Sequence, residues 1–341
     1  VLSRLLWYNA RIVFNRQRMG IMPVIEVQDL VKKYNGSEAV SGVSFDVAEG
    51  EVFGFLGPNG AGKTTTMKIL CTLLNFDSGA ARVNGFDCRK EPAKVRSSIG
   101  LVFQEMTLDN ELTAYENLKF HCYMYNMDKR LTEDRIAEIL DVVGLSGRGS
   151  DIVKKFSGGM KRRLEIARGL LHRPKVLFLD EPTLGLDPQT RSHVWEFIKQ
   201  LKRAEGNTVF MTTHYMEEAE ACDRIAIIDN GKIIACARPD ELKRSLRGDT
   251  IYIKTADDSR AIVEIEEKFG LKAKMTEAGL SLLVPGGEKF IPKLFEALQT
   301  VILAVNLKKP SLEDVFINLT GREIRDYGPS PMYKRNNSRH A

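Results

Sequence analysis

A glycine-rich stretch contains the residues whose types and spacing most directly predict chemistry. It reads Gly57-Pro58-Asn59-Gly60-Ala61-Gly62-Lys63-Thr64-Thr65 and fits the pattern G-x-x-x-x-G-K-[ST]. In such a loop, backbone N–H groups turn toward phosphate oxygens, and the positive end of the following helix adds to their effect. The stretch therefore predicts a nucleoside triphosphate site in which Lys63 reaches the β- and γ-phosphates and the Thr64 hydroxyl ligates Mg²⁺.

The residues on either side favour this interpretation over a glycine turn that binds nothing. An apolar run at residues 52–56 precedes the loop and is typical of a strand, and a helical pattern begins at Thr65. Strand, glycine loop and helix, in this order, are the context that the phosphate-binding pattern requires.

Two neighbouring carboxylates follow a second apolar run, at residues 176–179. Because side chains alternate along a strand, Asp180 and Glu181 can take different tasks. We expect Asp180 to hold a Mg²⁺-bound water and Glu181 to polarise the attacking water, as a base worth ~10²–10⁴ in rate. A strand that simply ends in solvated acids is the alternative, and this stretch alone leaves it open.

The segment Ser157-Gly158-Gly159-Met160 predicts a second phosphate contact. Ser157 occupies an N-cap position, and Gly158 and Gly159 expose N–H groups at the positive end of the following helix. Since the glycine loop already holds one nucleotide, this helix end would serve the nucleotide of a partner subunit. An ordinary helix cap needs no second glycine, which favours the phosphate contact over a cap alone.

With these segments the chain resembles the ATP-binding cassette (ABC) family, whose signature is a Ser-Gly-Gly that opens a helix just before the Asp-Glu strand. The resemblance covers residues 24–240, with every expected motif in order and a departure at Met160, where glutamine is commoner. It implies that Gln104 contacts Mg²⁺ and the attacking water, that His214 contacts the γ-phosphate, and that Tyr34 stacks on adenine. Taken alone, a glutamine is more often a surface residue and a tyrosine a core residue.

Asp187 has two interpretations that are compatible with each other. With Pro188 it matches an N-cap followed by proline at the first helical position. The resemblance also places this aspartate at a dimer interface.

The resemblance implies an ATPase that closes head to tail as a homodimer or heterodimer, with Mg²⁺ and ATP between Lys63 of one subunit and Ser157 of the other. Residues 310–322 resemble the C-terminal region of drug- and antibiotic-exporter cassettes of the daunorubicin-resistance type. We therefore expect the ATP-binding subunit of a membrane exporter, bound peripherally at the cytoplasmic face of the membrane through a separate permease. No nucleic-acid partner is expected.

Two other classes of protein compete with this hypothesis. A soluble cassette ATPase acting on ribosomes or DNA would resemble either tandem cassettes or a cassette split by long coiled coils. The chain has one glycine loop, and no heptad repeat separates Gly57 from Ser157. The second class is a regulatory module that does not hydrolyse ATP, and the joint presence of Gln104, Glu181 and His214 argues against it.

Short apolar runs alternate with helical patterns from Pro23 onward, which predicts an α/β fold. We expect a P-loop NTPase core at residues 23–240, with a largely parallel sheet, an antiparallel β subdomain and a helical insertion at about residues 105–172. The expected strands lie at residues 24–27, 42–47, 52–56, 81–84, 99–103, 176–179, 208–212 and 225–229.

In the helical insertion, a capping box formed by Thr113 and Glu116 predicts the start of one helix, and a second helix is expected to start at Thr132. Aromatic residues in this part form either the contact surface for the permease or the helix core, because aromatic side chains are enriched in both settings. They are Tyr115, Phe120, Tyr123 and Tyr125.

The rest of the chain predicts a small accessory domain. After a linker at residues 239–248, the pattern strand, helix, strand, strand, helix, strand over residues 250–307 is typical of a split β-α-β arrangement, so an α+β domain is expected at 249–320. Residues 1–22 are an extension of uncertain role. Residues 321–341, rich in proline, asparagine and basic residues, are expected to be disordered.

The composition agrees with a soluble globular protein. The chain has 341 residues, of which 43% are hydrophobic and 28% charged, which suggests about two domains. Its net charge of +5 is mild and does not indicate nucleic-acid binding. Five scattered cysteines without a C-x-x-C pair argue for a reducing cytosol and against disulfides or a zinc site. No apolar run approaches the ~18 residues that span a bilayer.

Overall fold

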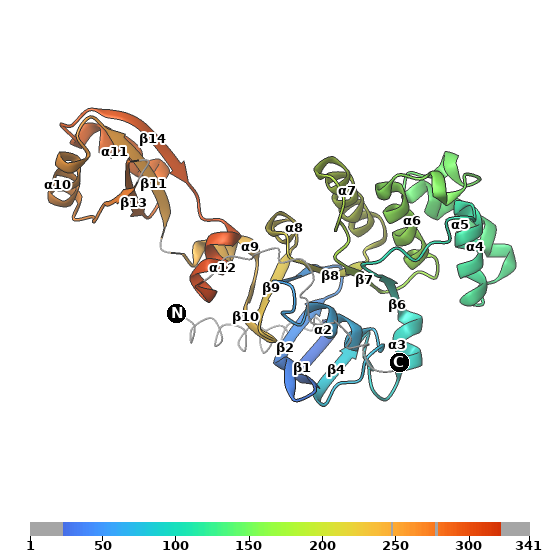
Figure 1. Cartoon of the computed structure of the whole chain (residues 1–341). Coiled ribbons are helices and arrows are strands. Elements are labelled where there is room, and N and C mark those ends of the chain that lie inside the picture. The colour runs from blue at the N-terminus through green and yellow to red at the C-terminus, as the bar shows by residue number, and fades with distance from the viewer. Residues whose placement is uncertain (1–22, 247, 277–278, 322–341) are drawn as a thin grey trace, which may run out of the picture. The chain divides into compact units, whose positions relative to one another are not determined.

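The computed structural model describes residues 23–246, 248–276 and 279–321 (Figure 1). The chain divides into two compact units, with the boundary between Ala237 and Arg238. The expectations for residues 1–22 and for the tail from 322 onward lie outside the described residues. None of the helices in the described ranges has the length and apolar character needed to cross a membrane.

A sheet with the strand order β10-β9-β3-β8-β7-β6 forms the centre of the first unit (Figure 1). All neighbouring strands run parallel except β10 and β9, which pair antiparallel. The apolar runs of β3 and β7 are buried along their whole length, as expected for strands covered on both faces. The strands are β3 (Val52–Leu56), β6 (Ile99–Val102), β7 (Val176–Asp180), β8 (Thr208–Thr213), β9 (Arg224–Asp229) and β10 (Lys232–Ala237).

Strand β10 is absent from the sequence-based expectation. It forms a hairpin with β9 through Asn230 and Gly231, which have φ values of 47° and 74°. Asn-Gly is the preferred pair for a two-residue hairpin turn, because both positions need positive φ. This turn signal was available in the sequence.

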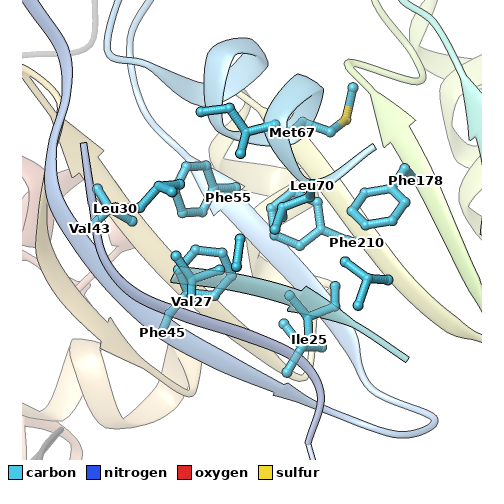
Figure 2. Close-up of a cluster of buried hydrophobic side chains, with 14 of the residues drawn as sticks. Ile25, Val27, Leu30, Val43, Phe45, Phe55, Met67, Leu70, Phe178 and Phe210 are labelled. Carbon is cyan, nitrogen blue, oxygen red and sulfur yellow. The ribbon is translucent and has the colours of Figure 1, made fainter. Parts of the chain in front are cut away.

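A second, antiparallel sheet has the order β2-β1-β4-β5. Apolar side chains fill the space between this sheet, the helix α2 (Lys63–Leu70) and the parallel sheet, as Figure 2 shows for Phe45, Met67 and Phe210. The ring centroids of Phe45 and Phe53 lie 5.5 Å apart, and those of Phe45 and Phe210 lie 5.9 Å apart. The strands of this sheet are β1 (Pro23–Tyr34), β2 (Ser37–Ala48), β4 (Ser78–Val83) and β5 (Phe86–Asp87).

Helices cover the parallel sheet and form the predicted insertion after β6. The expected P-loop NTPase core, with its antiparallel β subdomain, is confirmed. The helices of this unit are α2 (Lys63–Leu70), α3 (Pro92–Ser98), α4 (Ala114–Met124), α5 (Lys129–Val142), α6 (Gly158–Leu170), α7 (Pro188–Glu205) and α8 (Met216–Glu220), with 3-10 turns η1 (Ser146–Arg148) and η2 (Val153–Lys155).

The start of α4 agrees with the sequence, whereas the start of α5 does not. Thr113 and Glu116 form the predicted capping box. The helix α5 begins before Thr132, because the Asp128 side chain caps it by accepting a hydrogen bond of 2.8 Å from the backbone N–H of Arg130. Glu133 and Asp134, which would stand in the first turn of a helix starting at Thr132, therefore lie further inside α5.

The aromatic residues of α4 do not form its core. Phe120 is 60% exposed and Tyr123 is 52% exposed, Tyr125 is exposed as well, and Tyr115 is half-buried. The buried face of α4 is formed by smaller side chains instead, at Ala114, Asn117, Leu118 and Cys122. The helix-core alternative is therefore wrong for Phe120 and Tyr123, whereas the ring of Tyr125 packs on that of His172, with 4.0 Å between the centroids.

In the second unit a four-stranded antiparallel sheet has the order β12-β13-β11-β14. The observed sequence of strands and helices matches the predicted split β-α-β pattern. The elements are α9 (Pro239–Arg244), β11 (Asp249–Thr255), α10 (Asp258–Phe269), β12 (Lys274–Thr276), β13 (Gly279–Val284), α11 (Gly287–Ala297), β14 (Ile302–Lys308) and α12 (Leu312–Thr320).

Part of the expected linker is the helix α9. Proline stands in its first turn with Asp240 and Glu241, and Lys243 and Arg244 stand in its last turn, which is the charge order that a helix dipole favours. Leu242 is buried, and α9 lies against α12 within this unit.

Candidate active site

The carboxyl ends of four neighbouring parallel strands bring the predicted site residues to one edge of the sheet. The glycine loop follows β3, Asp180 ends β7 and Glu181 comes directly after it, His214 follows β8, and Gln104 follows β6. Ligands of open α/β sheets bind outside this edge. Residues far apart in the sequence therefore meet in one candidate site.

The backbone of the glycine loop requires glycine at two of its fixed positions. A Cβ at Gly57 would clash with the carbonyl oxygen of Ile228. Gly62 has a φ of +102°, and a Cβ there would clash with the carbonyl oxygen of Ala39. Directly after Gly62 the helix α2 begins at Lys63. Its first N–H groups have no partner within the helix and are oriented as an anion site requires.

The side chain of Lys63 turns back toward the glycine loop and contacts its backbone. Its Nζ donates to the carbonyl oxygens of Gly57 at 2.8 Å and Pro58 at 3.2 Å, and it lies 3.2 Å from Oε1 of Glu181. The side chain is buried. The cation of the loop and the carboxylate of β7 therefore form a direct ion pair.

Glu181 lies between Lys63 and His214. Its Oε2 is 3.2 Å from Nδ1 of His214. Burial alone would raise the pKa of Glu181, but the contact with His214 and the charge of Lys63 outweigh burial and hold this pKa below its ordinary value. Glu181 is thus an ionised, oriented carboxylate.

The backbone at Glu181 lies in the left-handed region, with a φ of 44°. This conformation is costly for a residue with a Cβ and is found preferentially at functional sites. Thr212 of β8 holds it, since its carbonyl oxygen and its Oγ1 accept hydrogen bonds of 3.2 and 3.1 Å from the Glu181 N–H.

Asp180 faces Thr64 across the site. Its Oδ1 accepts hydrogen bonds from the hydroxyls of Thr64 at 3.2 Å and Thr212 at 2.5 Å. Burial raises the pKa of Asp180 above its ordinary value, although both hydroxyls act against this. A hydroxyl and a carboxylate in contact are hard oxygen ligands, which Mg²⁺ uses together with substrate phosphates and waters. The pair therefore fits a magnesium ion.

The raised pKa of Asp180 predicts that this charge costs stability. A group whose pKa is raised by folding binds protons more tightly in the folded state, so stability rises as the pH falls through that pKa. We expect Asp180→Asn to raise the Tm of the nucleotide-free protein at neutral pH, with a gain that becomes smaller as the pH falls toward the raised pKa of Asp180.

Thermal unfolding followed by circular dichroism measures this effect. Asp187→Asn is the matched control, because hydrogen bonds from the Thr190 hydroxyl and N–H lower the pKa of Asp187 and make its charge stabilising. A lower Tm for Asp180→Asn than for the wild type would contradict the electrostatic argument.

Two of the predicted contacts are exposed side chains. Gln104 is exposed just after β6. Tyr34 ends β1 and is 47% exposed, with Nζ of Lys32 lying 5.5 Å from its ring centroid. Tyr34 is therefore not a core residue, and its ring is accessible to a planar ligand.

Ser157 caps α6 as predicted, but Gly159 has a structural reason of its own. The Ser157 Oγ accepts a hydrogen bond of 3.3 Å from the N–H of Met160. A Cβ at Gly159 would clash with Cγ2 of Thr190 on α7. The argument that an ordinary cap needs no second glycine is therefore wrong, because close packing of α6 on α7 requires one.

Ser157 and Gly158 remain exposed at the start of α6. Asp187 caps the neighbouring helix α7, with Oδ1 accepting a hydrogen bond of 2.9 Å from the N–H of Thr190. The two helix N-termini lie next to each other, since Gly159 and Thr190 are in contact.

The sequence analysis missed several buried polar residues of the site. Thr212 contacts both Asp180 and Glu181. Arg162, Glu165 and Glu218 are buried charges around the same strand ends. A charge within an amphipathic helix is normally solvated, so the sequence carries no signal for this burial.

Strand, glycine loop and helix, with Asp180 at the end of a nearby parallel strand, define a P-loop NTPase. The family model of the ABC transporter matches residues 40–184, and that of the DrrA1-3-like ATP-binding protein C-terminal domain matches residues 238–320. The linearmycin resistance ATP-binding protein LnrL of Bacillus subtilis is 41% identical over 89% of this chain and 100% of its own length. The daunorubicin/doxorubicin resistance ATP-binding protein DrrA of Streptomyces peucetius is 40% identical over 89% of this chain and 94% of its own length.

A solved structure with the same fold is a dimeric post-hydrolysis state of the ATP-binding cassette MJ0796 bound to ADP and Pi. It has a TM-score of 0.57 and 27% identity, and it covers 63% of this chain and 98% of that chain. The chain therefore belongs to the ATP-binding proteins of the ABC transporter family, and it is an ATPase. These two predictions are confirmed, and no finding supports the alternative that acts on ribosomes or DNA.

Proposed function

We propose that this chain is the ATP-hydrolysing subunit of an exporter of drug-like or antibiotic molecules. The observation that carries the ATP-hydrolysing part of this proposal is the meeting of Lys63, Asp180, Glu181 and His214 at one sheet edge. The names of the relatives support the direction of transport, because LnrL and DrrA are resistance ATP-binding proteins and a further relative is a Nod factor export ATP-binding protein.

The chain's own residues divide the work of hydrolysis. The glycine loop and Lys63 bind the phosphates, and Tyr34 stacks on the adenine. Thr64, Asp180 and Gln104 would hold a magnesium ion, which supplies charge neutralisation at the phosphates when bound. Glu181 accepts a hydrogen bond from the attacking water, and His214, which orients Glu181, contacts the γ-phosphate.

The exposed start of α6 supplies the second half of an ATP site that two subunits share, the first half being the glycine loop of the other subunit. Ser157 and Gly158 are exposed at a positive helix end, which Gly159 continues as a buried residue. They bind the γ-phosphate of ATP held by the glycine loop of another subunit, and Asp187 lies in the interface. Two subunits thus close head to tail around two ATP molecules.

The exposed aromatic side of α4 is the proposed contact with a separate membrane permease. Phe120, Tyr123 and Met124 are each more than half exposed along one helix. A cluster of large exposed apolar side chains marks a protein interaction site, and aromatic residues and methionine are enriched in interfaces. Binding there holds the chain peripherally at the cytoplasmic face of the membrane.

Purification of the tagged Glu181→Gln protein from detergent-solubilised membranes of its host, with ATP present, tests this proposal. We expect a polytopic membrane protein to co-purify, and we expect Phe120→Glu in the same background to lose it. Phe295→Glu on α11 is the matched control, because Phe295 is an equally apolar side chain that is 56% exposed. Recovery of ribosomes or DNA without a membrane protein would contradict the proposal.

A further inference from the structure

Arg162 lies one turn into α6 from Ser157, at the centre of a buried network that the steps above do not use. Its side chain is 2% exposed. A guanidinium group has five N–H donors, and the structure offers Arg162 five acceptors. They are the carbonyl oxygens of Phe103 (2.6 Å), Asp180 (3.1 Å), Glu181 (3.3 Å) and Pro182 (2.6 Å), and Oε2 of Glu165 (3.0 Å).

The four carbonyl acceptors belong to the two strand ends that carry the catalytic side chains, whereas Glu165 lies on α6 itself. Phe103 directly precedes Gln104 after β6. Asp180 ends β7 and Glu181 follows it, and Arg162 holds both through their main-chain carbonyl oxygens. The segment of residues 103–107 is called the Gln104 loop. The side chain of Arg162 therefore sets the spacing between the Gln104 loop and the backbone of Glu181.

Glu165 holds the other side of the Gln104 loop. This residue is 0% exposed, and its Oε1 accepts hydrogen bonds of 2.6 Å from the N–H and 3.2 Å from the hydroxyl of Thr107. Arg168 donates to the carbonyl oxygen of Thr107 at 3.1 Å. The exposed residues between Phe103 and Thr107 are thus bound to α6 at both ends.

A further buried carboxylate extends the network toward His214. Glu218 accepts a hydrogen bond of 2.5 Å from the hydroxyl of Thr213, which precedes His214, and another from the hydroxyl of Thr183. The charge of Arg162 also acts on Glu218 and Asp180. Arg162 is therefore a buried cation that pairs directly with Glu165 and lies within the same group of buried carboxylates as Asp180 and Glu218.

We infer that Arg162 and Glu165 are positioning residues that couple the Ser157 end of α6 to Gln104 and Glu181. α6 is one continuous helix from Gly158 to Leu170, so a displacement of its Ser157 end moves Arg162 and Glu165 with it. Engagement of Ser157 by the nucleotide of a second subunit then adjusts the Gln104 loop and the Glu181 backbone together. This inference rests on the proposed roles of Ser157, Gln104 and Glu181.

Arg162→Lys and Glu165→Gln in the full chain test the inference. Lysine keeps the charge but offers three donors in place of a planar set of five, and glutamine keeps the shape of Glu165 but removes its charge. We expect kcat to fall about 10- to 100-fold, the size of effect that a displacement of about 1 Å has on reacting groups, with the Kd for ATP unchanged. Hydrogen exchange of the Thr107 amide should become faster in Glu165→Gln.

Arg163→Lys is the matched control on the same helix, since Arg163 donates to the carbonyl oxygens of Val143 at 2.9 Å and Gly144 at 3.4 Å, away from the strand ends. The same kcat in Arg162→Lys and Arg163→Lys would overturn the inference, and so would a lower Tm with an unchanged kcat. If Arg162→Lys does not fold, Glu165→Gln tests the inference through two measurements, kcat and the rate of hydrogen exchange of the Thr107 amide. An unchanged kcat in Glu165→Gln would then overturn the inference. A Ser157→Arg protein with full activity would refute the proposed half-site instead.

Discussion

Replacing Glu181 by glutamine should leave ATP binding intact and nearly abolish turnover. Glutamine fills the same volume, but its amide cannot accept a proton or polarise water as a carboxylate does. A positioned base contributes ~10²–10⁴ in rate, so we expect a loss of kcat of about that size. The phosphate contacts of the glycine loop and Lys63 are not made by Glu181, which is why the Kd for ATP should stay similar.

Steady-state phosphate release and titration with a fluorescent ATP analogue measure the two quantities separately. Glu217→Gln is the matched control, because Glu217 is an exposed glutamate close to His214 in the sequence. Wild-type turnover in Glu181→Gln would remove the role that we propose for this residue. Loss of ATP binding together with turnover would instead indicate that the ion pair with Lys63 maintains the loop.

Replacing Ser157 by arginine should stop hydrolysis without affecting the ATP affinity of a single subunit. Ser157 is exposed at the start of α6, and none of its described contacts reaches the glycine loop of the same chain. The lost N-cap costs about 1 kcal/mol, which is too little to unfold a typical domain. A large side chain at this helix end would, however, prevent a second subunit's phosphate from approaching.

The same two assays measure the effect of Ser157→Arg. Ser150→Arg serves as control, since Ser150 is an exposed serine of the same helical insertion. Normal turnover in Ser157→Arg would show that each subunit completes its site alone, and the head-to-tail arrangement would then be wrong.

Local patterns in the sequence predicted the parts of the site that depend on backbone geometry. The glycine loop, the cap at Ser157 and the cap at Asp187 each arise from a few consecutive residues, and the structure has these features at the expected positions. The capping box at Thr113 follows the same rule.

Features that depend on tertiary packing were missed or wrongly explained. The burial of Arg162 is created by strand ends that come from distant parts of the chain. Gly159 is required by Thr190 on another helix. The exposure of Phe120 and Tyr123 likewise follows from which face of α4 packs inward, and helical periodicity alone did not decide this.

The shared ATP site is the central claim, and sedimentation equilibrium of the Glu181→Gln protein tests it most directly. Because turnover is blocked, ATP should convert this protein from monomer to dimer. The Glu181→Gln, Ser157→Arg double variant should bind ATP equally well and remain a monomer. An ATP-dependent dimer of the double variant, or a Glu181→Gln protein that stays monomeric with ATP bound, would contradict a site formed between Lys63 of one subunit and Ser157 of the other.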